Sequence, residues 1–433
     1  MGDTDHKGIG FWGIVAIGVG GMVGGGIFAV LGLSVQLAQG AAPLAFAVGG
    51  LVTLLTAYSY TKLSVTYPDE GGTVVFLDRA FNPGIIVGGF NVLLWASYVV
   101  MLSLYAYAFG SYGSTFFSEA SRPFAKHLLI SASIIGITGL NMLKADVISR
   151  AETWIVAIKV TILLAFVAIG LFGVDTSRLS PGAWADPLHV IAGGMIVFVA
   201  YEGFELIANT AQDVRDPKRV LPKAFFTAVI FVIALYILVA IVTVGGLSLE
   251  KIQAAQDYAL AAAAEPFLGA TGFIIISIAA LLSTSSAINA TLYGAARLSF
   301  TIAKERELPE ALERQVWHRP IEGLFITTIL TLLMANLVDL SSISTVGSAG
   351  FLLIFGAVNA ANMKLHQRTG GSVWISGAGL VACLLALAAL IWQTITTQPS
   401  RLLILTGMLV LALGLETVYR TLRQRPLHLQ RNR

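Results

Sequence analysis

The stretch Gly18-Val-Gly-Gly-Met-Val-Gly-Gly-Gly26 interrupts the first long apolar segment of the chain. Glycine occupies six of these nine positions, and each glycine in a helix interior costs up to about 1 kcal/mol relative to alanine. A continuous helix is therefore unfavourable here. In a membrane, the amides and carbonyls freed by a break are tolerated only where they line a cavity inside the protein. The stretch predicts an unwound helix beside such a cavity.

The amides of Gly24, Gly25 and Gly26 would begin the second half of the broken helix. A helix start presents unpaired N–H groups and the positive end of the helix dipole, so it can bind an anion. Two alternative interpretations remain open. The pairs Gly20–Gly24 and Gly21–Gly25 fit a close helix-packing face. A dinucleotide-binding loop is the other, although its glycine spacing is one residue off and no strand precedes it.

The composition of the chain is that of a membrane protein. Of 433 residues, 56% are hydrophobic and only 12% are charged, and the mean hydropathy is +0.80, whereas soluble domains carry about 25% charged residues. The single cysteine, Cys383, excludes an internal disulfide framework and a cysteine-based metal site. The histidines lack metal-ligand spacing, and the sequence contains no catalytic constellation or phosphate loop. We therefore expect neither an enzyme nor a metal or cofactor site.

Twelve apolar segments approach the length of roughly 20 residues that a transmembrane helix needs. Every backbone polar group in lipid must be paired internally, so these segments are predicted to be helices. The predicted fold class is an all-α integral membrane protein. The segments are residues 11–36, 41–64, 85–110, 127–142, 152–173, 188–210, 224–246, 267–300, 322–338, 343–363, 373–395 and 401–419.

Positive charge indicates how the helices are oriented, because basic residues concentrate in cytoplasmic loops. If the N-terminus lies inside, few basic residues fall in loops on the outside. These are Arg122, Lys126, Arg178, Lys251 and Arg401. The remaining basic residues fall on the cytoplasmic side, apart from Lys159, which lies within a predicted helix. We therefore predict a multi-pass protein of the cell membrane with both termini in the cytoplasm.

The loops divide the chain into parts. Residues 1–10 are predicted to form a cytoplasmic tail, 11–173 a first half of five helices and 188–363 a second half of five. Residues 373–419 add two accessory helices, and 420–433 form a basic cytoplasmic tail. The tail either carries the positive charge usual for a cytoplasmic segment or binds anionic lipid. The basic residues are scattered among short loops, so we expect no nucleic-acid partner.

A second irregularity, Phe198-Val-Ala-Tyr-Glu-Gly-Phe-Glu205, lies near the middle of the sixth predicted helix. A charged residue at the centre of a spanning helix costs about 3 kcal/mol. Glu202 and Glu205 are therefore either functional or neutral, hydrogen-bonded packing groups. Helices one and six begin the two five-helix halves, and interruptions at corresponding positions of two halves indicate an inverted-repeat transporter with its site at the membrane midplane.

Lys159 lies deep in the fifth predicted helix, with no acidic residue within a helical turn. Burial disfavours the charged form of a lysine, so this side chain is a candidate for proton exchange near neutral pH. The alternative is a permanently charged lysine bonded to carbonyls of an unwound helix. In the eighth predicted helix, the hydroxyls of Ser283 and Ser286 share one face. They could bind a sodium ion, contact Lys159 or bond back to their own helix.

Three motifs resemble signatures of the amino acid–polyamine–organocation (APC) superfamily of transporters. They are Gly24-Gly-Gly-Ile-Phe28, Tyr201-Glu-Gly-Phe-Glu205 and Asp213-Val-Arg-Asp-Pro217. The first has glycine where the superfamily has serine, at Gly25. The resemblance extends from about Phe11 to Tyr419. It implies the LeuT-like fold, a five-plus-five inverted repeat, here with two additional C-terminal helices, and transport by alternating access.

A closer resemblance is to the archaeal, proton-coupled ApcT branch of that superfamily, which works without sodium. It rests on Arg150-Ala-Glu152 with Lys159, on Leu282-Ser-Thr-Ser-Ser-Ala-Ile-Asn-Ala-Thr291 and on Leu308-Pro-Glu310. It implies that the Lys159 amine stands where sodium-coupled relatives bind sodium. Its partners would then be the Gly20 carbonyl and Ser283. A related arginine antiporter has a pH-sensing glutamate in its sixth helix, which implies a role in the proton response for Glu205.

The same resemblance implies a substrate site between the two irregular helices. The α-carboxylate would contact the amides of Gly25 and Gly26, and the α-amino group would contact the carbonyls of Met22, Val199 and Glu202. The full set of substrate-binding candidates is Met22, Gly24, Gly25, Gly26, Phe198, Val199 and Glu202. If the Glu202 side chain faces the cavity, it would favour a second amine on the substrate.

The sequence therefore predicts a secondary transporter that takes up amino acids with protons, independently of sodium. Its partners would be the amino acid, protons and the lipid bilayer, and its oligomeric state stays open. Two alternatives remain. One is an exchanger of amino acids, or of an amino acid for an amine. The other is a transporter-like nutrient sensor, which would bind its ligand without moving it.

Overall fold

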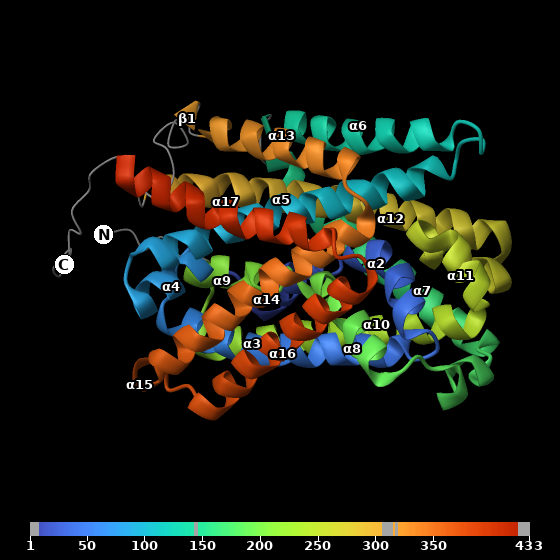
Figure 1. The fold of residues 1–433 in the computed structure, drawn as a ribbon, viewed down its shortest axis with the longest axis horizontal. Coiled ribbons are helices and arrows are strands. Elements are labelled where there is room, and N and C mark those ends of the chain that lie inside the picture. Colours follow the sequence, from blue (N-terminus) through green and yellow to red (C-terminus); the bar gives the residue numbers. More distant parts are fainter. Residues whose placement is uncertain (1–7, 143–145, 305–314, 317–318, 423–433) are drawn as a thin grey trace.

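The computed structural model describes residues 8–142, 146–304, 315–316 and 319–422. Within these residues the protein is helical apart from one short antiparallel hairpin of β1 (Gln315–Val316) and β2 (Arg319–Pro320). Figure 1 shows long helices packed side by side, most of them running roughly along the longest axis of the molecule. The fold class predicted from composition, an all-helical membrane protein, is confirmed.

The longer helices follow the predicted segments in order. They are α1 (Phe11–Met22), α2 (Gly26–Ala38), α3 (Ala42–Thr66), α5 (Ile85–Ser114), α6 (Arg122–Met142), α7 (Asp146–Gly170), α8 (Pro187–Val197), α10 (Pro217–Gly246), α12 (Ala259–Lys304), α13 (Ile321–Leu337), α14 (Leu340–Lys364), α16 (Val373–Thr397) and α17 (Arg401–Leu422). Shorter helices connect them: α4 (Thr73–Phe81), α9 (Leu206–Asn209), α11 (Leu249–Ala255) and α15 (His366–Thr369).

Ten helices of the described residues are long and apolar enough to cross a membrane, or eleven when α1 and α2 are counted as one bent span. The predicted segment 322–338 coincides with α13, whose 17 residues fall short of the usual span. The number of twelve therefore stays a prediction. Residues 1–7 and 423–433, most of the two predicted tails, lie outside the described residues, as does the motif Leu308-Pro-Glu310.

Two segments differ from the prediction. The predicted start at residue 267 is a kink inside α12, which begins at Ala259 and bends at Gly269, where φ is +61°. Pro266, which cannot donate an intrahelical hydrogen bond, lies just before this bend. The short helix α4 occupies a stretch predicted to be a loop. Its nine residues bury Phe76 and Leu77 against the core, which explains why so short a piece is helical.

The accessory helix α16 is fastened to the core by a buried polar network. The Ser59 hydroxyl of α3 donates to Asn359 Oδ1 of α14 at 2.7 Å and to Ser376 Oγ of α16 at 3.1 Å. Asn362 Nδ2 also donates to Ser376 Oγ, at 2.8 Å. Polar side chains in an apolar medium are stable only when they are hydrogen-bonded, so this network fixes how α3, α14 and α16 fit together.

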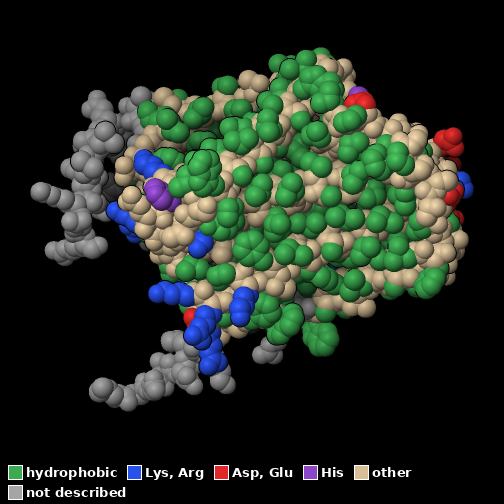
Figure 2. Space-filling model, turned by 90° about the horizontal axis from the view of Figure 1, so that it is seen from below, with side chains coloured by type: hydrophobic (Ala, Val, Ile, Leu, Met, Phe, Trp, Pro, Cys, Tyr) green, Lys and Arg blue, Asp and Glu red, His purple; other side chains and the backbone are tan. Residues whose placement is uncertain are grey.

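Apolar and charged side chains occupy different parts of the surface. Figure 2 shows hydrophobic side chains across the broad middle of one face, while most of its Lys and Arg side chains gather at one end. That end holds α4, α15 and the described ends of the chain (Figure 1). At this end Ile9 forms an isolated β-bridge with Val214. The Ile9 amide donates to the Asp213 carbonyl at 2.8 Å, and the Arg215 amide donates to the Ile9 carbonyl at 3.0 Å.

Candidate functional site

The first break in the helical structure lies where the glycine run predicts it. Helix α1 ends at Met22, α2 begins at Gly26, and the two axes differ in direction by 49°. The three residues between them, Val23, Gly24 and Gly25, are buried. The predicted unwinding is confirmed. The broken ends therefore lie inside the protein, as a break in a membrane requires.

The second break lies in the sixth span. Helix α8 ends at Val197, a short 3-10 turn follows from Phe198 to Tyr201, and α9 begins at Leu206. Glu202, between the turn and α9, has an extended backbone with ψ of 152°. Two spans are thus interrupted, and both interruptions are buried.

The two breaks touch through backbone atoms at Gly21 and Gly203. A Cβ atom on Gly21 would lie 2.6 Å from the Gly203 carbonyl oxygen, and a Cβ on Gly203 would lie 2.5 Å from the Gly21 carbonyl carbon. Gly203 also has φ of +107°, which glycine adopts without strain. The pairs Gly20–Gly24 and Gly21–Gly25 straddle the end of α1, so they do not form the single helix face that the close-packing alternative requires, although Gly21 itself packs closely against the second break.

Tyr236 of α10 joins the two breaks by hydrogen bonds. Its hydroxyl lies 2.6 Å from the Met22 carbonyl oxygen at the end of α1 and 3.2 Å from the Ala200 carbonyl oxygen in the 3-10 turn. Its side chain is fully buried. Tyr236 cannot be identified from sequence, because one tyrosine in an apolar span resembles an ordinary packing residue.

Two serines of α14 form hydrogen bonds to backbone groups at the second break. The Ser344 and Ser348 hydroxyls donate to the Ile196 carbonyl at 2.8 and 3.2 Å. The Val199 amide donates to Ser348 Oγ at 3.2 Å. Backbone groups that a helix break leaves unpaired need such partners. These serines were also missed from sequence, where they are part of a serine-rich stretch without an obvious partner.

Glu202 points toward the first break. Tyr105 of α5 donates its hydroxyl hydrogen to Glu202 Oε2 at 3.1 Å. The Tyr105 ring also lies against Gly25, where a Cβ atom would come within 2.6 Å of it. Only 4% of Glu202 is exposed. The side chain therefore lies between the two breaks, where the resemblance placed the substrate.

Glu205 is held differently. Its Oε2 accepts the Gly203 amide at 2.8 Å, so the carboxyl group caps the turn that carries it. The other oxygen, Oε1, is buried and has no hydrogen-bond partner among the described residues. Glu202 and Glu205 are close enough for their carboxyl groups to interact. The structure thus places two neighbouring carboxyl groups inside the span.

Lys159 reaches the first break from α7. Its ammonium nitrogen lies 3.0 Å from the Gly20 carbonyl oxygen, and the side chain is fully buried. Ser283 of α12 reaches the same break, with its hydroxyl 3.1 Å from the Val23 carbonyl oxygen and 3.0 Å from that of Gly24. The structure therefore brings the predicted group of Lys159, Gly20 and Ser283 to one broken helix.

Some of the backbone groups predicted to bind the substrate already have partners within the protein. Gly25 and Gly26 lie at the start of α2, where helix amides are unpaired. The Met22 carbonyl, a predicted acceptor for the substrate amine, already accepts the Tyr236 hydroxyl. A carbonyl oxygen has two lone pairs, so Met22 retains capacity for a second donor. Phe198 packs edge-on against Phe355 of α14, with ring centroids 5.8 Å apart.

A family model described as amino acid permease matches residues 9–413. The chain therefore belongs to the amino acid permease family of the APC superfamily, whose members are membrane transporters and not enzymes. The family implies the LeuT-like fold, in which broken helices form the central site.

Similar proteins occur in Methanocaldococcus jannaschii, Escherichia coli and Arabidopsis thaliana. The chain is 34% identical over 428 residues, 98% of each chain, to an uncharacterized protein of Methanocaldococcus jannaschii. It is 34% identical over 414 residues, 95% of this chain and 96% of the other, to the inner membrane transport protein YbaT of Escherichia coli. It is 24% identical over 452 residues, 96% of this chain and 76% of the other, to the chloroplastic cationic amino acid transporter 7 of Arabidopsis thaliana.

Proposed function

We propose that this permease takes up amino acids together with protons, without sodium, by alternating access. Membership of the amino acid permease family supports the substrate class. The observation that carries the coupling is the buried Lys159 ammonium on the Gly20 carbonyl of the broken helix. A fixed amine in this position supplies the positive charge that a bound sodium ion would otherwise supply. Unlike an ion, it can lose a proton and stay in place.

The coupling step follows from this hydrogen bond. A charged ammonium donates a strong, charge-assisted hydrogen bond to a carbonyl, and a neutral amine donates a weaker one. Loss of the Lys159 proton therefore loosens the tie between α7 and the end of α1. Ser283 holds the adjoining carbonyls of Val23 and Gly24 from α12. Protonation would thus set how firmly α1 is attached to α7, which is one requirement for alternating access.

The substrate would lie between the two breaks. Its α-carboxylate would bind the amides of Gly25 and Gly26, and its α-amino group the free carbonyl capacity of Met22, Val199 and Glu202. The Glu202 side chain accepts a hydrogen bond from Tyr105, whose ring lies against Gly25. In this position it would attract a second amine on the substrate. One relative, the plant transporter, is named for cationic amino acids. Glu205, whose buried carboxyl group lies beside that of Glu202, is a second candidate proton carrier.

The proposal is tested by replacing Lys159 with alanine and with arginine. In proteoliposomes, Lys159→Ala should still bind substrate but should lose uptake driven by a pH gradient. Lys159→Arg keeps a cation that does not deprotonate near neutral pH, so it should likewise lose proton-driven uptake. The exposed lysine Lys251 provides a control, and Lys251→Ala should transport normally. If Lys159→Ala took up substrate at the wild-type rate under a pH gradient, the coupling role of Lys159 would be refuted.

Two further measurements separate the alternatives. Uptake should be unchanged when sodium is replaced by choline, because the amine occupies the position of the ion. Uptake that requires amino acid or amine inside the vesicle would instead indicate an exchanger. Binding without any uptake by the wild-type protein would indicate a sensor.

A further inference from the structure

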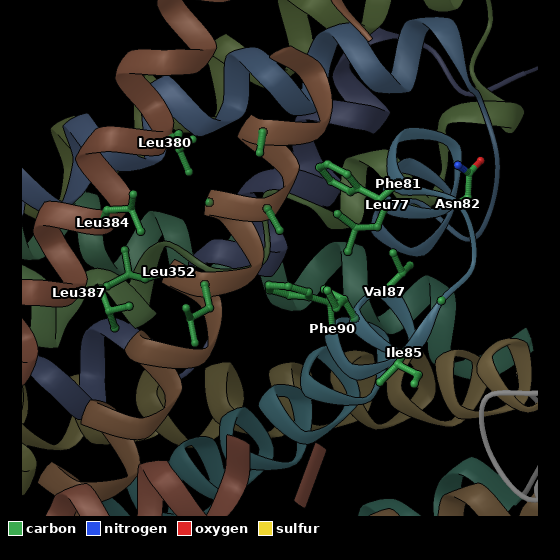
Figure 3. A pocket seen from close by; sticks show the side chains of 16 residues that line it. Leu77, Phe81, Asn82, Ile85, Val87, Phe90, Leu352, Leu380, Leu384 and Leu387 are labelled. Carbon is green, nitrogen blue, oxygen red and sulfur yellow. The ribbon is translucent and has the colours of Figure 1, made fainter. Parts of the chain in front are cut away.

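An apolar cavity opens on the outer surface of the helix bundle, away from the two breaks. It is a groove of about 1180 Å³ between α4 and the start of α5 on one side and α16 on the other, with α14 along its base. Figure 3 shows Leu77 and Phe81 of α4 on one wall and Leu380 and Leu384 of α16 on the opposite wall. None of its lining residues belongs to the broken helices, so it is separate from the transport site.

Small residues on α14 create the space. Gly356, Ala357 and Ala360 line the groove between the larger side chains of α4 and α16. At Gly356 a Cβ atom would lie 3.6 Å from the nearest groove residue, Leu380, an ordinary contact distance. Alanine would therefore fit at Gly356 without a clash, and the glycine there leaves the base of the groove wider.

The walls of the groove continue into the lipid-facing surface. Ile86 is 71% exposed and Leu384 is 54% exposed, and both line the groove. Their neighbour Leu385, outside the groove, is 66% exposed. In water such an apolar hollow would cost about 25 cal/mol for each Å² of its surface. In a bilayer, hydrocarbon fills such a hollow, so lipid acyl chains are the expected occupants of the groove.

One end of the groove carries a cation and an amide. Lys364 ends α14 and follows Ala360 by four residues, so both lie on the same side of the helix. The Lys364 ammonium stands over the ring of Phe81, 5.1 Å from its centroid, in a cation–π contact. Asn82, also at this end, is the single polar side chain among the lining residues. Lys and Arg side chains gather at this end of the molecule (Figure 2).

We propose that this groove binds an anionic phospholipid. The acyl chains would lie between α4 and α16, and the headgroup phosphate would contact Lys364 and the amide of Asn82. An apolar trough that ends in a cation matches the charge pattern of such a lipid along its length. The chain's own residues 423–433 match it poorly, because they contain four arginines and only two leucines. This proposal does not depend on which solute the protein transports.

The test measures lipid retained by the purified full-length protein. The protein is extracted from vesicles containing equal amounts of phosphatidylglycerol and phosphatidylcholine with the same acyl chains, and its bound lipid is counted by native mass spectrometry. Wild type should retain phosphatidylglycerol in preference. Lys364→Gln should lower that preference roughly five-fold, the factor expected for one lysine near an anionic lipid. Ala360→Trp should fill the groove and remove bound lipid of both kinds.

Matched variants show whether the groove itself is responsible. Arg368→Gln removes an exposed cation one turn beyond Lys364, and Leu385→Trp enlarges a lipid-facing residue outside the groove. Both should retain phosphatidylglycerol as wild type does. Unchanged lipid retention by Ala360→Trp would overturn the proposal, as would a loss of preference in Arg368→Gln equal to that in Lys364→Gln. A wild-type dimer that Ala360→Trp dissociates would assign the groove to a second copy of the chain and refute a lipid site.

Discussion

Gly203 combines a left-handed backbone with the closest contact between the two breaks. Its φ of +107° strains any other residue, and a Cβ atom there would meet the backbone of Gly21 and Met22. Strain of this kind costs on the order of 1–3 kcal/mol, and the clash adds to it. We therefore expect Gly203→Ala to lower the melting temperature of the purified protein by several degrees and to abolish uptake.

The control for this substitution is Gly136→Ala in α6, where a Cβ atom would meet nothing within 4 Å. That variant should be as stable as wild type or slightly more so, because alanine favours a helix. Equal melting temperatures for Gly203→Ala and Gly136→Ala would show that the contact between the breaks does not constrain the fold.

Glu202 gives a prediction about selectivity. Its carboxyl group lies beside Tyr105 and the first break, so we expect it to attract substrates that carry a second amine. Glu202→Gln keeps the shape and removes the charge, and it should shift preference toward neutral amino acids. Competition of unlabelled amino acids against a radiolabelled substrate measures this ranking. An identical ranking in wild type and Glu202→Gln would disprove the role of the charge.

Among individual residues, the sequence singles out those that are unusual in an apolar span. The glycine run, Lys159 and the two carboxylates are each costly in lipid, which makes them conspicuous in sequence. Tyr236 and Ser348 are equally central to the breaks, yet their cost is hidden, because each is satisfied by backbone carbonyls or amides far away in the chain. Such partners depend on tertiary packing, so no local pattern identifies them.

At the scale of single elements, Asp339 caps the start of α14. Asp339 accepts the Ser342 amide at 3.0 Å and the Ser342 hydroxyl at 2.5 Å. Arg401, the first residue of α17, lies 3.5 Å from the same carboxylate. Partial burial would raise the pKa of Asp339, but the hydrogen bonds from Ser342 and the charge of Arg401 outweigh it, and the pKa is lowered.

The sign of the pH effect follows from this lowered pKa. A carboxyl group with a lowered pKa stabilises the fold above its unfolded pKa, and that contribution disappears as the pH falls through the folded pKa. Asp339→Ala should therefore lower the melting temperature at about pH 7, by the effect of about 1 kcal/mol typical of a lost cap. The difference from wild type should shrink at about pH 3. Glu119→Ala, in an exposed turn, is the control and should leave the melting temperature at about pH 7 close to that of wild type.

Elements were predictable where their hydrophobicity was continuous. The segments that became α3, α5 and α10 are long and apolar, and length alone identifies them. The eighth span was predicted to start at residue 267, close to the kink at Gly269, but the helical stretch that precedes the kink was not predicted. Helix α4 is too short for hydropathy to detect, since its stability comes from burial of one face.

At the scale of the whole molecule, the uneven distribution of basic residues predicts orientation. Lys and Arg gather at one end of the molecule (Figure 2), the end that holds α15 and α4 in Figure 1, and the positive-inside rule assigns that end to the cytoplasm. With Cys383 replaced by alanine, single cysteines at Gly182 and Arg368 test this. A membrane-impermeant maleimide added to whole cells should label Gly182→Cys and not Arg368→Cys. The reverse labelling would invert the predicted topology.

The overall architecture was predictable to a limited depth. Composition alone established a helical membrane protein, and the broken spans pointed to a central site. How the helices pack was not predictable, because apolar helices in lipid have no solvent-facing side to set their rotation. The buried network of Ser59, Asn359 and Ser376 sets that rotation for α16, and only the folded chain reveals it.

The β-bridge at Ile9 determines how firmly the segment before α1 is attached to the helix bundle. Two backbone hydrogen bonds hold this segment to Asp213 and Arg215, and each contributes a net 0.5–1.5 kcal/mol or so. Since about 1.4 kcal/mol corresponds to a tenfold ratio, this tie alone biases the segment toward attachment by roughly five- to a hundredfold. This bias corresponds to roughly one molecule in six to one in a hundred with the tie undone while the bundle behind it stays folded.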